Sequence, residues 1–325
     1  MGQFRLLHLS DLHFCRRPNN PDLLALFRAN PLSAARVLIF DERINRLASY
    51  QPQLADAIAE FVYHERDGLD AVVITGDLAT TGINIDLQPA ERYVAEPCSS
   101  KWLTSRQTSS LASAGLPIFV LPGNHDRYLD DVGRSGGTEF DRTFAIQWPT
   151  GARVHTRRLR SPDDAEKLGI VLVDFCLRRD ADAKRPTRMN RYGRGRVYPS
   201  IVRELVSATR GLYDEGITAV VWATHFPPSP VYEDEEEDDC MRLLESDALI
   251  AAAQECEIRH LLAGHIHRNH RYEIGDLEVF CAATSTAVSE YPNEIHVLSI
   301  WVEGGRVSAV NRQDHPYNLE RQSFA

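Results

Sequence analysis

Short runs of apolar residues recur along the chain and alternate with polar and helical stretches. Each run is rich in Val, Ile and Leu and is about four to eight residues long, as is typical of a buried strand. This pattern predicts eight strands: Phe4–Leu9, Leu69–Ile74, Pro117–Leu121, Ile170–Val173, Ile217–Ala223, Ile258–Leu262, Leu277–Ala282 and Ile295–Val302.

Two stretches between these runs carry the periodicity of an amphipathic helix. One precedes the second strand and the other precedes the fifth, and their apolar faces are Leu54, Ala57, Ile58, Phe61 and Val62, then Ile201, Leu205 and Leu212. Strands that alternate with helices predict a layered α/β fold. The tail reads instead as strands joined by tight turns such as Gly304-Gly305, which predicts a hairpin at a sheet edge. We expect one domain over residues 1–325, with 273–325 as closing strands and tail.

Composition narrows the class of protein. The chain has 325 residues, is 43% apolar and carries a net charge of −10, so a nucleic-acid partner is not favoured and would need a local basic patch. No apolar run reaches the ~18 residues of a membrane span, and no secretory leader is visible. The six cysteines are scattered without a CxxC pair, which indicates reduced thiols and a cytoplasmic location.

Three stretches stand apart from the strand pattern. Residues 178–196 are rich in arginine, and residues 233–239 read EDEEEDD. Such charge runs are usually solvated loops. Alternatively, they pair across the mouth of a site, or the arginines collect an anionic substrate. Residues 14–50 read as an additional helical stretch that could form a wall of the pocket.

Five of the predicted strands end in a small polar cluster. In an open α/β sheet, ligands bind beyond the carboxyl ends of the strands, so five clusters at five such ends can converge. The clusters are Ser10-Asp11-Leu12-His13, Thr75-Gly76-Asp77, Gly123-Asn124-His125-Asp126, Thr224-His225 and Gly264-His265-Ile266-His267.

These clusters supply seven oxygen and nitrogen donors, with His125 in addition. The donors are Asp11, His13, Asp77, Asn124, His225, His265 and His267. One zinc ion takes about four ligands, whereas seven suit two ions that share a carboxylate, the usual clamp for phosphoryl chemistry. The absence of a thiolate favours Mn, Fe or Zn, as divalent or trivalent ions.

The order D-x-H, GD, GNH[D/E], H and GHxH resembles the calcineurin-like metallophosphoesterases, and all five blocks occur between Asp11 and His267. The resemblance implies two mixed β-sheets packed face to face and flanked by helices, a four-layer sandwich. It implies that one metal is held by Asp11, His13 and His267. It also implies that Asn124, His225 and His265 hold the other metal, that Asp77 bridges them, and that His125 stands beside the phosphoryl group.

The resemblance also implies a mechanism. The two ions polarise the phosphoryl oxygens and activate a bridging water as hydroxide, which attacks phosphorus in line with the leaving group. His125 is expected to give the leaving oxygen a proton, with Asp126 either orienting that imidazole or capping a helix. His8 is expected to be either a packed histidine or one that supports the ligands, and Asp174 is expected to support the ligands. Substrate contacts are expected from one or two of Arg16, Arg17, Arg127 and Arg268.

Departures from the motifs of known subfamilies narrow the range of expected substrates. In "LPGNHD", Pro122 takes the position of an arginine in phosphoprotein phosphatases, and Leu78 and Ala79 stand where purple acid phosphatases have a tyrosine. The motifs most resemble the bacterial cyclic-nucleotide phosphodiesterase group. We therefore expect hydrolysis of a cyclic nucleotide or a similar small phosphodiester. The alternatives are a phosphomonoesterase, a nuclease or, less favoured, a non-catalytic metal-binding scaffold.

Overall fold

The structure is a computed structural model that describes residues 1–15, 50–82, 84–97, 109–127, 138–161, 165–177, 193–229, 241–287 and 291–324. Most of the expected helical stretch 14–50, most of the arginine-rich stretch 178–196 and the whole acidic stretch 233–239 lie outside the described residues.

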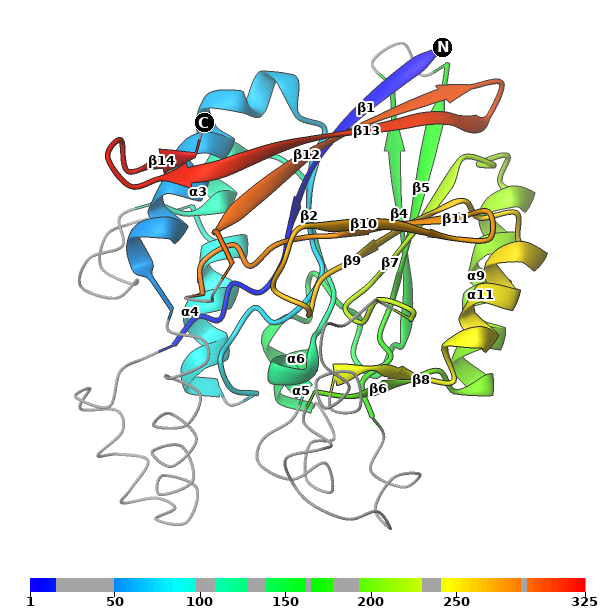
Figure 1. Ribbon diagram of the computed structural model, residues 1–325, viewed down its shortest axis with the longest axis horizontal. Coiled ribbons are helices and arrows are strands. Elements are labelled where there is room, and N and C mark those ends of the chain that lie inside the picture. The colour runs from blue at the N-terminus through cyan, green and yellow to red at the C-terminus, as the bar shows by residue number, and fades with distance from the viewer. Residues whose placement is uncertain are drawn as a thin grey trace.

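The first of two six-stranded sheets contains both ends of the described chain (Figure 1). Its order is β14-β13-β12-β1-β2-β3, with β1 (Gly2–Leu9), β2 (Ala71–Ile74), β3 (Ile118–Val120), β12 (Glu294–Glu303), β13 (Arg306–Asn318) and β14 (Ser323–Phe324). Strands β1, β2 and β3 are parallel, and β12 is antiparallel to β1. The predicted hairpin is confirmed, because β12 turns into β13 through Gly304 and Gly305 at positive φ.

The second sheet has the order β10-β11-β9-β7-β5-β4. Its strands are β4 (Val154–Arg160), β5 (Lys167–Val173), β7 (Val220–Thr224), β9 (His260–Ala263), β10 (His270–Ile274) and β11 (Leu277–Cys281). The four central strands are parallel, and β4 and β10 close the edges in the antiparallel sense. All eight predicted strands are present. The edge strands β4 and β10 were not expected, because they bury few side chains and lack an apolar run.

Helices cover the outer faces of both sheets. In Figure 1, α3 (Pro52–Glu65) and α4 (Asn84–Ala95) lie on one side, and α9 (Pro199–Asp214) and α11 (Ser246–Glu255) lie on the other. The two predicted amphipathic helices are α3 and α9, whose apolar faces are buried except for the partly buried Phe61. The shorter elements are α5 (Asn124–Arg127), α6 (Thr138–Thr143), η1 (Arg66–Gly68), η2 (Leu111–Ala114), and a ribbon of β6 (Gly195–Arg196) and β8 (Leu243–Leu244).

Alternating side chains on β5 show how the layers pack. Ile170 and Leu172 join a buried cluster with the first sheet, whereas Val171 and Val173 pack with residues of α9 such as Ile201. Apolar residues therefore fill the space between the sheets and the space beneath the outer helices, which confirms the four-layer sandwich.

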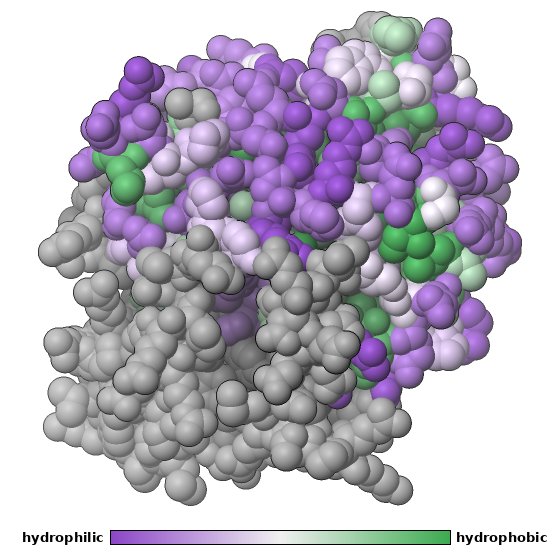
Figure 2. All heavy atoms as spheres, in the orientation of Figure 1, coloured by the Kyte–Doolittle hydropathy of each residue, from purple (hydrophilic) through white to green (hydrophobic). Residues whose placement is uncertain are grey.

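The described part of the face in Figure 2 is mostly hydrophilic, and its hydrophobic residues form small, separate spots. Among the described residues, no helix combines the length and apolar character needed to cross a bilayer.

Candidate metal centre

The five polar clusters meet where strand ends of the two sheets face each other. Three clusters follow β1, β2 and β3 of the first sheet, and two follow β7 and β9 of the second. Their donor atoms form three overlapping groups, each with all its atoms within 4.8 Å of one another. The groups are Asp11, His13 and His267; His13, Asp77 and His125; and Asp77, His225 and His265. The predicted convergence of the strand-end clusters is thus confirmed.

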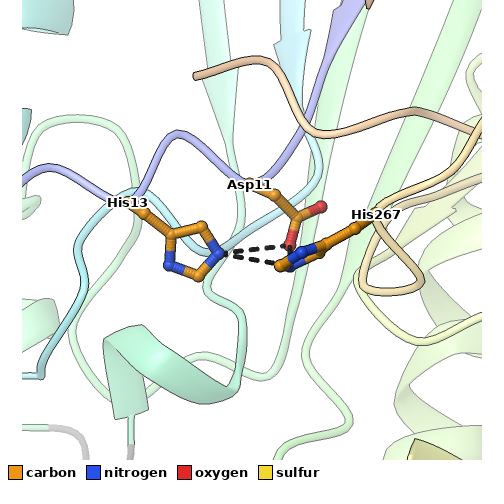
Figure 3. Close-up of side chains that lie close together, drawn as sticks. All are labelled: Asp11, His13 and His267. Carbon is orange, nitrogen blue, oxygen red and sulfur yellow. Dashed lines mark hydrogen bonds and ion pairs between the residues drawn. The ribbon is translucent and has the colours of Figure 1, made fainter. Parts of the chain in front are cut away.

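Asp11 and His13, from the loop after β1, and His267, from the loop after β9, point toward one another (Figure 3). His267 Nε2 lies 3.1 Å from Asp11 Oδ1 and 3.3 Å from His13 Nε2. Asp11 Oδ1 is buried, yet it accepts no well-aligned hydrogen bond from any described residue. Buried polar atoms are rarely left in this state. A cation between these three side chains would satisfy the carboxylate oxygen and both imidazole nitrogens.

A second set of donors surrounds His225 Nε2. This nitrogen lies 2.9 Å from Asn124 Oδ1, 3.2 Å from His265 Nδ1 and 3.4 Å from Asp77 Oδ2. Asp77 Oδ2 also lies 3.8 Å from His13 Nε2, so Asp77 is the side chain that the two sets have in common. The donor sets therefore fit two ions that share one carboxylate.

Backbone carbonyls fix the orientation of three histidine rings. His225 Nδ1 donates to Thr75 O at 2.7 Å, His265 Nε2 to Met241 O at 2.9 Å, and His125 Nδ1 to Thr80 O at 2.8 Å. In the neutral form of each ring the other nitrogen presents its lone pair to the centre. Burial lowers the pKa of His225, but Asp77 outweighs it and raises the pKa to about 9, so this ring reaches the neutral form by releasing a proton when a metal ion binds. Metal-binding histidines are commonly oriented in this way.

Electrostatics in the centre favours ionised carboxylates. Burial alone would raise the pKa of Asp77, but the imidazoles of His225, His125 and His13 outweigh it and hold the pKa below its ordinary value. Burial lowers the pKa of His265 to about 3, so this ring is neutral at pH 7. Ionised carboxylates and neutral imidazoles are the forms that bind metal ions.

Left-handed backbone conformations are concentrated at the same side chains. Of the nine described non-glycine residues with positive φ, five are candidate ligands: Asp11 (56°), His13 (48°), Asp77 (53°), His265 (72°) and His267 (55°). Each such conformation costs on the order of 1–3 kcal/mol and persists only where the surroundings enforce it. The strain therefore supports a functional role for this centre.

Asp126 does not orient the His125 imidazole, and that expectation was wrong. Its carboxylate accepts hydrogen bonds from the backbone N–H groups of Leu78, Ala79 and Gly123, at 3.1, 2.9 and 2.9 Å. Thr80 O instead holds the ring of His125. Asp126 therefore ties the loop after β2 to the loop after β3.

The expected supporting residues have well-defined places. His8 is buried behind the centre with its Nε2 3.0 Å from Thr75 Oγ1. Asp174 accepts hydrogen bonds from Arg127 and Arg153 at 2.9 and 2.8 Å. It therefore supports α5 through Arg127 and does not contact a candidate metal ligand itself. Arg127, one of the four arginines from which one or two substrate contacts were expected, is buried and paired with Asp141 and Asp174.

Three other arginines were expected as possible substrate contacts. Arg16 and Arg17 lie outside the described residues. Arg268 packs with its guanidinium carbon 6.0 Å from the centre of the Tyr291 ring.

Another group of possible ligands, Glu294, His296 and Asp314, lies apart from these donor sets. Both ring nitrogens of His296 are already used, since Nδ1 lies 2.8 Å from Asp314 Oδ1 and Nε2 accepts the Ala283 N–H. Asn269 donates to both acids. This group is a satisfied polar network rather than an open site.

Sequence reasoning missed a sixth polar cluster, Thr284-Ser285-Thr286, which follows β11. All three residues are fully buried, and two of their hydroxyls bind the backbone around Asp11. The available signal was three consecutive hydroxyl residues at the end of an apolar strand. Because β11 is parallel to β9, its carboxyl end lies at the same edge of the sheet.

The comparisons with known proteins agree with this geometry. The family described as calcineurin-like phosphoesterase matches residues 4–269, a span that contains all seven predicted ligands. The chain belongs to the calcineurin-like phosphoesterase family. This membership, together with the buried Asp and His groups, makes the protein a metal-dependent phosphoesterase.

Solved structures show that this phosphoesterase shares its fold with distant proteins. Purple acid phosphatase PPD1 from yellow lupin (Lupinus luteus) seeds is 10% identical, with a TM-score of 0.53 over 95% of this chain and 53% of that chain. GAP50, described as the anchor in the inner membrane complex of Plasmodium, is 11% identical, with a TM-score of 0.50 over 97% and 89%. None of the curated proteins searched matches the sequence.

Proposed function

We propose that this phosphoesterase hydrolyses a small phosphodiester, such as a cyclic nucleotide, with two transition-metal ions drawn from Mn, Fe and Zn. The observation that carries the proposal is the sharing of Asp77 by two buried donor sets. Asp11, His13 and His267 would hold one ion, Asn124, His225 and His265 the other, and Asp77 both. Such ions supply charge that stabilises phosphoryl oxygens and lowers the pKa of water.

His125 is the proposed proton donor to the leaving oxygen. Its Nδ1 is held by Thr80 O, and its Nε2 faces the centre, 3.9 Å from Asp77 Oδ2. Burial lowers the pKa of His125 to about 4, so the free ring is neutral at pH 7. A bound phosphoester anion raises the pKa of a neighbouring imidazole. The ring is therefore proposed to gain its second proton with the substrate and to pass it to the leaving oxygen.

The preference for a diester rests on charge. A phosphomonoester is a dianion, which guanidinium groups match best through paired hydrogen bonds. Pro122 stands directly before the Gly123-Asn124 motif, and the nearby Arg127 is occupied by Asp141 and Asp174. A diester carries one negative charge, which two metal ions can neutralise without an arginine. A monoesterase remains the alternative on the same metal centre.

Steady-state kinetics with two chromogenic esters tests the proposal. With saturating Mn²⁺, bis-p-nitrophenyl phosphate is expected to show a higher kcat/KM than p-nitrophenyl phosphate. Asp77→Ala, purified in parallel, should lose both activities and so exclude a contaminating phosphatase. A monoester advantage of about tenfold or more would replace the diesterase assignment with a phosphatase. If the diester is preferred, cyclic nucleotides are the first natural compounds to test.

A further inference from the structure

The segment Ala282–Ala287, which follows β11 of the second sheet, packs against the ligand loop after β1 of the first sheet. Every residue of this segment is buried. It approaches the loop Ser10–His13, which carries two donors of the metal centre. We call residues Thr284, Ser285 and Thr286 the hydroxyl clamp.

Four consecutive carbonyls of the ligand loop each accept a hydrogen bond from another segment. Three of the donors belong to the hydroxyl clamp, and the fourth is a threonine after β2. The pairs are Ser285 N to Ser10 O (3.0 Å), Thr284 Oγ1 to Asp11 O (3.1 Å), Thr286 Oγ1 to Leu12 O, and Thr80 Oγ1 to His13 O (2.7 Å). Such complete pairing fixes the rotation of each peptide plane in the loop.

The loop needs this support because its backbone is strained. Asp11 and His13 have φ values of 56° and 48°, which are unfavourable for residues with a Cβ. Their N–H groups donate to Gly76 O and Asp77 O at 3.1 and 2.9 Å, which secures one side of the loop. The hydroxyl clamp secures the carbonyl side, where the apolar side chains of the core could not accept or donate a hydrogen bond.

The clamp also contacts His267, which forms a group of candidate metal ligands with Asp11 and His13, and the clamp is held in turn by Asn293. Thr284 N donates to His267 O at 3.3 Å. Asn293 Nδ2 donates to Thr284 O and Ala287 O at 3.1 and 2.8 Å. The clamp therefore reaches the backbone of Asp11 and His267 directly, and that of His13 through the peptide at Leu12.

We infer that the Thr284 and Thr286 hydroxyls position Asp11 and His13 for one of the two metal ions. This inference rests on the proposed two-metal function and adds positioning residues to it. Partners that orient metal ligands typically contribute about 10- to 100-fold in metal affinity. The effect should fall on the ion bound by the β1 loop and spare the ion near Asn124, because among the described residues the clamp makes its hydrogen bonds to the first donor set.

Calorimetric titration of the metal-free protein with Mn²⁺ tests the clamp. His13→Ala and Asn124→Ala identify which binding step belongs to which donor set. Thr284→Val and Thr286→Val should each weaken the step that His13→Ala removes by about 10- to 100-fold. The other step should stay within about threefold. Thr284→Ser and Thr286→Ser keep the hydroxyl and should bind nearly as tightly as the wild type.

A matched control lies on the outer helix α9. Thr209 is also fully buried, donates to Leu205 O and accepts from Trp222 Nε1, so Thr209→Val removes a buried hydroxyl elsewhere. This variant should lose stability and keep both Mn²⁺ affinities. Amide hydrogen exchange in the metal-free protein adds a second readout, since exchange at Asp11 and His13 should accelerate only in the valine variants of the clamp.

The outcomes separate the clamp from the proposed reaction. Unchanged Mn²⁺ affinities and unchanged exchange in both valine variants would overturn the clamp and leave the two-metal centre intact. A wild type that binds two ions but prefers monoesters would overturn the proposed substrate and leave the clamp intact. A wild type without the His13-dependent binding step would overturn the clamp and the two-metal function together.

Discussion

Gly123 and Gly264 lie where the backbone comes closest to the side chains of the metal centre. A Cβ on Gly123 would overlap Asp77 Oδ1, and one on Gly264 would overlap Ser10 Oγ. Neither neighbour can retreat, because Asp77 and Ser10 are fully or almost fully buried. These glycines are therefore required for space, as the backbone must pass directly against the shared carboxylate and the β1 loop.

Replacement of Gly123 by alanine should displace Asp77 and weaken both metal ions at once. We expect Gly123→Ala to retain fewer metal ions per chain after dialysis than the wild type, as measured by elemental analysis. Gly211→Ala is the matched control, because a Cβ there meets nothing within 4 Å and the site is helical. That variant should keep both ions and gain up to about 1 kcal/mol of stability. Full metal occupancy in Gly123→Ala would contradict the assigned role of Asp77.

His125 should matter for chemistry and little for metal retention. His125→Ala removes the proposed proton donor, so kcat should fall by about 10²- to 10⁴-fold for esters with poor leaving groups. The loss should shrink for p-nitrophenyl esters, whose leaving group needs no proton. Parallel metal analysis gives the decisive comparison, since an emptied centre in this variant would make His125 a ligand instead.

At the scale of elements, a buried ion-pair network joins the end of β5 to α5. Asp174 follows β5 and lies between the guanidinium groups of Arg127 and Arg153, and it also accepts the Cys176 N–H at 2.8 Å. Arg127 ends the short helix that begins with Asn124, and it also binds Asp141. This network links the second sheet to the helix that presents Asn124 and His125.

Asp174→Asn should destabilise the protein and flatten its response to acid. Burial alone would raise the pKa of Asp174, but Arg153 and Arg127 outweigh it and lower the pKa. A carboxyl group with a lowered folded-state pKa stabilises the protein above its unfolded pKa of about 3.9, and this contribution is lost as the pH falls toward the folded-state pKa.

Denaturant unfolding at pH 7 should therefore show a loss of about 3 kcal/mol in the variant, the usual cost of breaking a buried pair. Between about pH 5 and 3 the stability of the wild type should decline more steeply than that of Asp174→Asn. If the stability of both proteins declined equally over this pH range, Asp174 would not be ionised in the folded protein.

The sequence predicted the elements with a strong apolar signal and the donors that follow them. It did not predict β4 and β10, because edge strands with few buried side chains leave no apolar run. The donors were predictable since Asp, Asn and His are costly at buried strand ends. The partners of these residues were not, because carbonyls such as Thr80 O act through the backbone and any residue could supply them. The expectation that Asp126 orients His125 was wrong for the same reason, because a backbone carbonyl holds that ring instead.

At the scale of the whole molecule, the candidate metal centre lies between two sheets that each supply part of it. Asp11, Asp77 and Asn124 follow strands of the first sheet, whereas His225 and His265 follow strands of the second. Neither sheet alone could supply both proposed donor sets, because His267 completes the set of Asp11 and His13, and His225 and His265 complete the set of Asp77. Metal binding should therefore depend on the packing of the whole sandwich, including the β11 segment that carries the hydroxyl clamp.

Counting metal ions per chain tests the central claim most directly. Wild-type protein refilled separately with Mn, Fe and Zn should approach two ions per chain by elemental analysis. Asp77→Ala should lower the occupancy of both sites, because its carboxylate is shared by the two donor sets. A wild-type protein that never exceeds one ion per chain with any of the three metals would contradict the two-metal account.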